Sequence, residues 1–205
     1  MCADFVYLAS ASPRRRQLLE QIGVPYQTLS VSIDESVAAA EAPSAYVSRL
    51  AEAKAEAGRR QARARGSAAR PVLAADTAVL IDGEILGKPT DAGDAERMLL
   101  RLSGRTHEVL TAVSLAGSGR LVSRVCRSEV TFRALGAHEA REYWNTGEPC
   151  DKAGGYAIQG CGAVFVADLR GSYSGVMGLP LYETAELLEE AGVPIWRPSA
   201  HRRSG

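Results

Sequence analysis

The chain has 205 residues, 46% hydrophobic and 23% charged, so it is long enough to bury a core and has the composition of an ordinary globular protein. Its 24 basic and 24 acidic side chains give a net charge of zero, which argues against a general nucleic-acid or membrane-surface binder. The N-terminus lacks the basic start of a signal peptide, and no apolar run approaches the roughly 20 residues of a membrane helix. We therefore expect a cytoplasmic protein.

The first predicted strand, Phe5–Ala9, runs directly into a helix predicted over residues 13–23, with Ser12 as its N-cap. The first turn of this helix carries Arg14 and Arg15 beside free backbone N–H groups. Cations are unfavourable at a helix N-terminus unless an anion binds there. The turn therefore predicts an anion-binding site.

A short strand is predicted over Tyr26–Val31, followed by a loop that contains Asp34 and Glu35. Adjacent acids in a loop are usually solvated. Glu35 can also act as a base or a metal ligand, because Mg²⁺ binds one or two carboxylates and leaves its other positions to water and phosphate.

A long helix is predicted over Pro43–Gln61, and its apolar stripe includes Val47, Leu50 and Lys54. The Lys54 ammonium either extends from the edge of that face into solvent or points into a cleft.

The central strand begins at Val72 and contains one acid, Asp76, before a tight reversal at residues 82–83 and then Lys88. A carboxylate within a buried strand must be paired, bind a cation or face a cleft. The alternative is that Asp76 only accepts hydrogen bonds from a neighbouring loop or from Thr77.

The second half of the chain predicts alternating elements and a glycine-rich segment, DKAGGYAIQG, at residues 151–160. In this segment Lys152 precedes two glycines, and the Gln159 amide can recognise a donor–acceptor edge. A glycine-rich turn that enters an edge strand is the simpler interpretation of the residues alone. The other elements are helices at 91–102, 137–146 and 179–190, strands within 104–117 and 121–135, and a loop at 170–178.

Lysine is scarce, since only Lys54, Lys88 and Lys152 occur among the 24 basic residues. A compact ammonium suits positions where the planar fork of arginine does not. A buried acid, a second acid, a basic helix N-terminus and these lysines together predict a site for a polyphosphate and a divalent metal. With no recognisable serine–histidine pair or reactive cysteine, attack by activated water is the simplest chemistry.

Several segments resemble the Maf family of nucleoside triphosphate pyrophosphatases. They are LASASPRR at residues 8–15, the acids at 34–35, the context of Lys54, AADT at 74–77, GKP at 87–89, SGRTHEV at 103–109, DKAGGYAIQG at 151–160 and GLPL at 178–181. The match extends from Leu8 to about Gly192, and all three lysines lie within it.

The resemblance implies an α/β fold with a mixed twisted sheet, flanking helices and two lobes around a central cleft, similar to inosine triphosphate pyrophosphatases. We expect one such domain over residues 1–196 and a disordered tail over 197–205. The resemblance also implies cleavage of a nucleoside triphosphate between the α and β phosphates with a divalent cation, Mg²⁺ or Mn²⁺, and homodimers, which are common in the family.

Motif position implies roles for individual residues. Asp76 matches the proton acceptor of the family. Arg14, Thr77 and Gln159 match positions linked to substrate choice, and Glu35, Lys54 and Lys88 match other cleft residues. The chemistry of the residues agrees: it assigns Asp76 as base or metal ligand, Glu35 as metal partner, and Arg14, Lys54 and Lys88 to the triphosphate. Arg15 and Lys152 complete the set of residues that we expect to bind the substrate.

The DKAGGYAIQG segment resembles the branch of the family that acts on dTTP and UTP, including modified pyrimidine nucleotides. Two alternatives remain at this stage. One is a nucleotide-binding regulator of septum formation in cell division, and the other is a pyrophosphatase for non-canonical purine triphosphates.

Overall fold

The computed structural model describes residues 4–117 and 119–196. The strands are β1 (Val6–Leu8), β2 (Tyr26–Thr28), β3 (Val72–Ile81), β4 (Glu84–Leu86), β5 (Thr106–Ala116), β6 (Leu121–Phe132) and β7 (Val166–Arg170). The α-helices are α1 (Pro13–Gln21), α2 (Pro43–Ala64), α3 (Ala92–Leu102), α4 (Ala137–Asn145), α5 (Tyr173–Met177) and α6 (Leu181–Glu190). Three 3₁₀ segments are η1 (Glu148–Asp151), η2 (Ala153–Gly155) and η3 (Cys161–Phe165).

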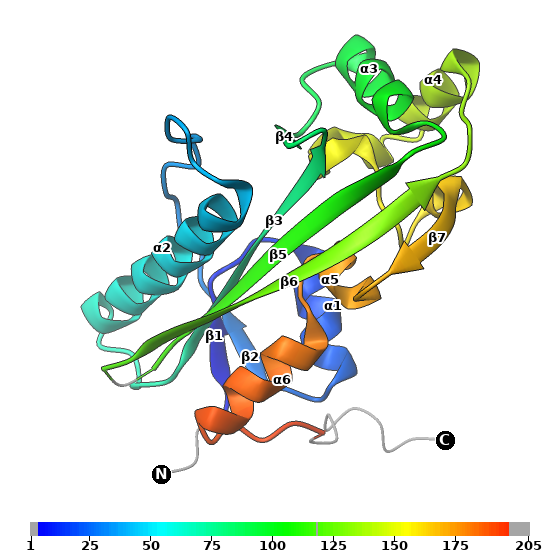
Figure 1. Cartoon of the computed structure of the whole chain (residues 1–205). Helices are drawn as coiled ribbons and strands as arrows, with labels where there is room; N and C mark the ends of the chain where they lie inside the picture. The colour runs from blue at the N-terminus through cyan, green and yellow to red at the C-terminus, as the bar shows by residue number, and fades with distance from the viewer. Residues whose placement is uncertain (1–3, 118, 197–205) are drawn as a thin grey trace. The chain divides into compact units, whose positions relative to one another are not determined.

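The strands form a mixed sheet in the order β2-β1-β3-β5-β6-β7, with β4 paired to β3 (Figure 1). Strand β1 is parallel to both β2 and β3, whereas β4 is antiparallel to β3 and β7 is antiparallel to β6. Parallel pairs need crossover connections, and here α1 and α2 occupy them. The predicted α/β fold with a mixed sheet and flanking helices is confirmed.

The chain divides into two compact units. The first comprises Met1–Asp76, Ala112–Val125 and Gly178–Gly205, and the second comprises Thr77–Thr111 and Cys126–Met177. The boundaries fall within β3, β5 and β6, so each of these long strands contributes residues to both units. The single domain over 1–196 and the central cleft stay predictions.

In the first unit, α2 packs against β1 and β3. Gly58 allows this close approach, because a Cβ at that position would lie 2.8 Å from Val72 Cγ1 and 3.0 Å from Ala9 Cβ. The helix extends three residues beyond the predicted end at Gln61, and its buried face continues to Ala62.

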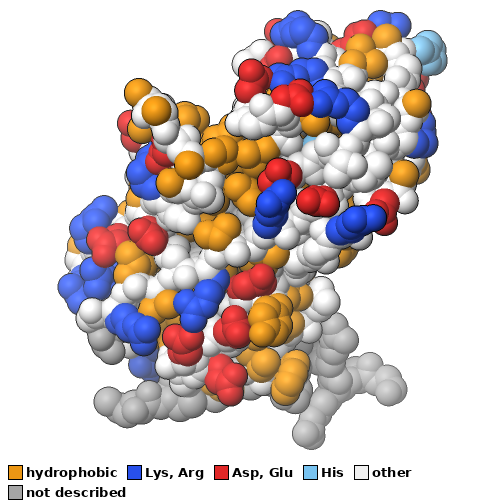
Figure 2. All heavy atoms as spheres, viewed as in Figure 1, with side chains coloured by type: hydrophobic (Ala, Val, Ile, Leu, Met, Phe, Trp, Pro, Cys, Tyr) orange, Lys and Arg blue, Asp and Glu red, His pale blue; other side chains and the backbone are white. Residues whose placement is uncertain are grey.

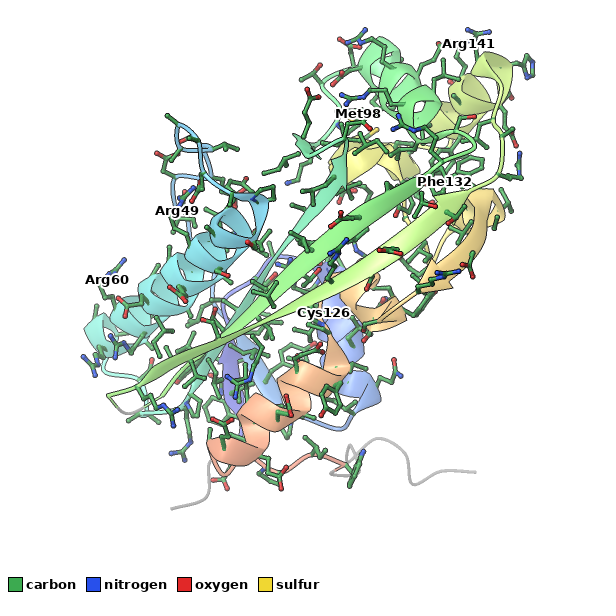
Figure 3. The ribbon with its side chains drawn as sticks, in the orientation of Figure 1. Arg49, Arg60, Met98, Cys126, Phe132 and Arg141 are labelled. Carbon is green, nitrogen blue, oxygen red and sulfur yellow. The ribbon has the colours of Figure 1, made fainter. Side chains whose placement is uncertain are left out.

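In the second unit, aromatic rings form the centre of the core. Phe132, which is labelled on β6 in Figure 3, has its ring centroid 4.9 Å from His107, 4.8 Å from Tyr156 and 5.9 Å from Phe165. Helix α3 begins at a side-chain cap, where Asp91 accepts a hydrogen bond of 2.8 Å from the backbone N–H of Asp94.

One local prediction was confirmed only in part, and another was wrong. Ser12 is the N-cap residue of α1, but its side chain makes no capping hydrogen bond with the residues that the structure describes. The predicted loop at 170–178 contains α5, whose first turn is closed by a 3.0 Å hydrogen bond from Gly175 N to Ser172 Oγ. The tail at 197–205 lies outside the described residues.

The surface carries no large area of one charge on the face shown in Figure 2, where basic and acidic side chains are interspersed. This distribution agrees with the zero net charge. Among the described helices, none is both long enough and apolar enough to cross a membrane.

Candidate functional site

Asp76 lies in the middle of β3 and is the last residue of the first segment of the first unit. Only 8% of its surface is exposed. Helix α2 presents Lys54 to this strand, and the Lys54 Nζ atom lies 2.6 Å from Asp76 Oδ1. Only 13% of the Lys54 side chain is exposed, so the ammonium points inward and does not extend into solvent. The buried carboxylate is therefore ion-paired.

Glu35 adds a second carboxylate to the same ammonium, because its Oε1 atom lies 2.7 Å from Lys54 Nζ. The loop that carries Glu35 is attached to α2 by two hydrogen bonds. Tyr46 Oη donates to the Glu35 carbonyl at 3.0 Å, and Arg49 Nη2 donates to the Ser36 carbonyl at 2.9 Å. Residues 35, 54 and 76 thus converge on one point of the first unit.

Arg15 is a half-buried cation of the first turn of α1. Its Nε donates to the Gly178 carbonyl at 2.7 Å, and its Nη1 donates to Ser10 Oγ at 3.3 Å. Burial lowers the pKa of Arg15, the negative charge of Asp76 opposes that effect, and the neighbouring Arg14 lowers the pKa further. A guanidinium remains charged at neutral pH despite such a decrease. The turn thus adds fixed positive charge near Asp76.

A divalent cation would find two carboxylates here. The described residues contain no group of three or more histidine, cysteine, aspartate or glutamate side chains arranged to hold a metal. Glu35 and Asp76 nevertheless direct oxygens at one cation, the Lys54 ammonium. Mg²⁺ commonly takes one or two carboxylates and fills its remaining positions with water and phosphate. The donor set therefore fits a metal that is completed by the substrate.

The other predicted residues belong to the second unit. Thr77 follows Asp76 in β3, so its side chain points to the opposite face of the strand, where its hydroxyl lies 3.0 Å from that of Thr111. Lys88 follows β4 and is exposed. Lys152 forms an ion pair with Asp151, and only 14% of its side chain is exposed.

One backbone hydrogen bond brings the segments of Lys88 and Lys152 together, since Gly154 N donates to the Gly87 carbonyl at 2.9 Å. Gln159 is exposed in the turn that follows buried Tyr156, Ala157 and Ile158. The second unit thus places two lysines and an amide on two hydrogen-bonded segments.

Sequence reasoning missed three supporting residues. Ser10 accepts hydrogen bonds from both Arg15 Nη1 and the Ser12 backbone, at 3.3 and 3.2 Å. Tyr143 and Glu148 hydrogen-bond to the segment around Gln159. The LASASPRR motif could have indicated Ser10, whereas no spacing in the sequence connects residue 148 to residue 159.

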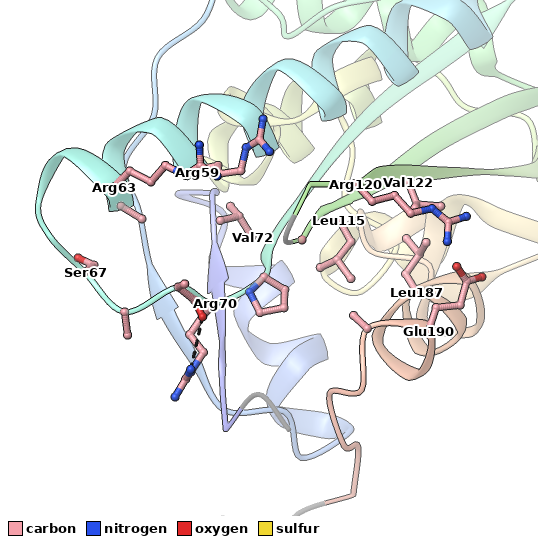
Figure 4. Close-up of a pocket in the computed structure, with 16 residues that line it drawn as sticks. Arg59, Arg63, Ser67, Arg70, Val72, Leu115, Arg120, Val122, Leu187 and Glu190 are labelled. Carbon is pink, nitrogen blue, oxygen red and sulfur yellow. Dashed lines mark hydrogen bonds between the residues drawn. The ribbon is translucent and has the colours of Figure 1, made fainter. Parts of the chain in front are cut away.

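A separate cavity of about 600 Å³ lies in the first unit, between the C-terminal end of α2, the β5–β6 hairpin and α6 (Figure 4). Val72, Leu115 and Leu187 form part of its apolar wall, and its basic side chains are Arg59, Arg63, Arg70 and Arg120. None of the predicted site residues lines this cavity. The cluster of Glu35, Lys54 and Asp76 therefore lies outside this cavity.

The sequence profile of the Maf-like protein family matches residues 5–191. A protein of Saccharophagus degradans named dTTP/UTP pyrophosphatase is 52% identical over 192 residues, which cover 94% of this chain and 91% of the relative. Relatives with the same name from Aromatoleum aromaticum and Chromobacterium violaceum are each 51% identical, over 199 and 190 residues. The first of these alignments covers 93% of this chain and 97% of the relative, and the second covers 93% and 96%.

Among solved structures, the Ham1 protein of Staphylococcus aureus aligns with a TM-score of 0.41 at 15% identity, covering 64% of this chain and 72% of that one. A TM-score below 0.5 is too low to establish a shared fold. The fold assignment therefore rests on the strand pairing.

Proposed function

This chain belongs to the Maf family, and we propose that it is a nucleoside triphosphate pyrophosphatase that hydrolyses dTTP and UTP to the monophosphate and pyrophosphate. The observation that carries the proposal is the convergence of Glu35, Lys54 and Asp76 beside half-buried Arg15, in a chain about 50% identical to proteins named for this reaction. Modified pyrimidine triphosphates that keep the imide edge belong to the same substrate class.

In the proposed reaction a water oxygen forms a bond to the α phosphorus, and the bond from that phosphorus to the bridging oxygen breaks. Pyrophosphate leaves with the bonding electrons, and Asp76 accepts the proton of the attacking water. Asp76 suits this role because it is the only acid in a largely apolar strand and is held in one place by Lys54.

Basic side chains and the metal ion would neutralise the negative charge of the triphosphate. The triphosphate oxygens would be bound by Arg14, Arg15, Lys54, Lys88 and Lys152, and these cations would reduce the repulsion between the oxygens and the nucleophile. Glu35 and Asp76 would hold Mg²⁺ or Mn²⁺. Such an ion supplies positive charge for the phosphate oxygens and orients the triphosphate.

The residues that would select the nucleotide are Arg14, Thr77 and Gln159. A side-chain amide presents one acceptor and two donor hydrogens, which complement the carbonyl and imide groups of thymine and uracil. Gln159 suits this role because its side chain is exposed and makes no hydrogen bond with the other described residues.

The test is pyrophosphate release from dTTP, UTP, CTP, dCTP, 7-methyl-GTP and ITP, with Mg²⁺ or Mn²⁺. We expect release from dTTP and UTP, and Asp76→Asn should lower kcat at least about 100-fold, the usual contribution of a general base. The exposed Asp168 provides a matched control, since Asp168→Asn should leave kcat unchanged.

Other results of this assay would contradict the proposal or favour another function. A preference for ITP would favour the purine pyrophosphatase, and a preference for 7-methyl-GTP would show that Gln159 does not select pyrimidines. Nucleotide binding without turnover in the wild type would favour a regulator of cell division. Full activity in Asp76→Asn would remove Asp76 from the chemistry.

A further inference from the structure

Gln159 occupies the third position of a tight turn in the second unit. Gly160 N donates to the Ala157 carbonyl at 3.2 Å, which closes the turn over Ile158 and Gln159. The side chain of Ile158 is buried and that of Gln159 is exposed. The position of the Gln159 backbone, and the direction in which its side chain leaves the turn, thus depend on what holds the two ends of this turn.

One pair of side chains holds both ends. Tyr143 Oη accepts a hydrogen bond from Ala157 N at 3.1 Å and donates its own proton to Glu148 Oε1 at 2.5 Å. The same carboxylate accepts from Cys161 N and Gly162 N, each at 2.9 Å. Residues 157, 161 and 162 are therefore attached to a single hydrogen-bonded unit, the Tyr143–Glu148 pair.

The Tyr143–Glu148 pair packs so closely against Gly160 and Gly162 that neither position has room for a Cβ atom. An added Cβ on Gly160 would lie 2.0 Å from Glu148 Oε2, and one on Gly162 would lie 2.7 Å from Tyr143 Oη. Neither glycine has a positive φ, so close approach and not backbone conformation favours glycine at both positions. Tyr143 itself is only 5% exposed and packs edge-on against Phe165, with ring centroids 4.9 Å apart.

The protonation states suit this arrangement. Burial raises the pKa of Glu148, but hydrogen bonds from Tyr143, Gly162 and Cys161 outweigh that effect and hold the pKa below its usual value. Burial and the neighbouring Glu148 raise the pKa of Tyr143. At neutral pH the carboxylate is therefore a charged acceptor and the phenol a donor, and such bonds are among the stronger hydrogen bonds of proteins.

We propose that the Tyr143–Glu148 pair is a positioning device for nucleobase selection, which acts through the Gln159 turn. This inference rests on the proposed function, since it assigns the pair a task in pyrimidine recognition. A base-selecting amide must be fixed in direction, because discrimination comes from hydrogen bonds that the wrong base cannot complete.

The test compares Glu148→Gln and Tyr143→Phe with the wild type, using kcat/KM for dTTP and for CTP. Loss of one well-placed hydrogen bond should lower the dTTP-to-CTP ratio about tenfold. Inhibition by inorganic tripolyphosphate, which has no base, should stay within about twofold of the wild-type value. Glu142→Gln, at an exposed position of α4, is the matched control and should leave both readouts unchanged.

A double-mutant cycle separates positioning from a general structural effect. In a Gln159→Ala background, Glu148→Gln should change the dTTP-to-CTP ratio no further, since residues that act through one another are not additive. A further decrease in that background would overturn the inference. If Glu148→Gln does not fold, Tyr143→Phe continues the test, because it removes only the hydroxyl.

The failure of this inference can be told from that of the proposed function. A wild-type protein that hydrolyses neither dTTP nor UTP contradicts the proposed function. A wild type selective for dTTP, whose folded Glu148→Gln and Tyr143→Phe variants keep the same selectivity, contradicts the positioning role alone. If both variants lost affinity for tripolyphosphate by the same factor as they lost kcat/KM for dTTP, the pair would belong to the phosphate site instead.

Discussion

Gly154 is constrained both by its backbone and by its neighbour, since its φ is +68° and an added Cβ would lie 2.9 Å from Val79 Cγ1. Gly154→Ala should lower the free energy of unfolding by about 2–5 kcal/mol, the sum of a left-handed alanine and an overpacked contact. Urea denaturation measures this change. Gly147→Ala is the control, because Gly147 has a φ of +75° and nothing within 4 Å, so it should cost only about 1–2 kcal/mol. Equal losses would mean that the Val79 contact is unimportant.

His107 makes stability depend on pH. Its Nε2 lies 2.8 Å from Tyr156 Oη, its Nδ1 is buried without a partner among the described residues, and burial lowers its pKa to about 4. Between pH 6.5 and 4 the unfolded chain therefore binds a proton that the folded chain does not, so stability falls with decreasing pH, by about 1.4 kcal/mol per unit.

His107→Gln should flatten this dependence, measured as the free energy of unfolding in urea between pH 7 and pH 5. The exposed His138 provides the matched comparison, and His138→Gln should keep the wild-type slope. A wild-type slope in His107→Gln would show that other groups account for the loss of stability.

At the scale of elements, two helices begin differently although both have a typical N-cap residue. Asp91 accepts a 2.8 Å hydrogen bond at the start of α3, whereas the Ser12 side chain makes no cap within the described part of α1. Asp91→Ala should therefore lower the free energy of unfolding by about 1 kcal/mol, and Ser12→Ala should leave it nearly unchanged. Thermal and urea denaturation test the pair, and an equal loss in both variants would contradict the difference in capping.

Elements with a clear local pattern could be predicted from sequence, and those fixed by distant contacts could not. The apolar run around Asp76 indicated β3, and the helical stripe through Lys54 indicated α2, because burial imposes a period on each. Helix α5 was missed because its sequence, YSGVM, contains a serine and a glycine, which are typical of loops, while Ser172 closes its first turn.

The candidate site, too, could be predicted from sequence only where it does not depend on contacts between distant segments. Residue chemistry indicated Glu35, Lys54 and Asp76, but the joint pairing of both carboxylates with Lys54 depends on three segments that meet only in the fold. The support of the Gln159 turn by Glu148 gave no signal, because an acid eleven residues away has no characteristic spacing.

For the whole molecule, the long strands predict cooperative unfolding. Since β3, β5 and β6 each contribute to both units, melting one unit breaks strands on which the other depends. The two tryptophans report on the units separately, since Trp144 lies in the second and Trp196 in the first. Trp144→Phe and Trp196→Phe should give the same midpoint in urea, by fluorescence and by circular dichroism. Two separate midpoints would show that the units unfold independently.

The shared ion pairs of Lys54 have a consequence for the order in which ligands bind. Without substrate, the ammonium already acts as an internal counter-ion for Glu35 and Asp76, so a free divalent cation has to compete with it. In the proposed function, a triphosphate would remove that competition by giving the ammonium new anionic partners. The metal and the nucleotide are then expected to enter as one complex, and affinity for the metal alone is expected to be weak.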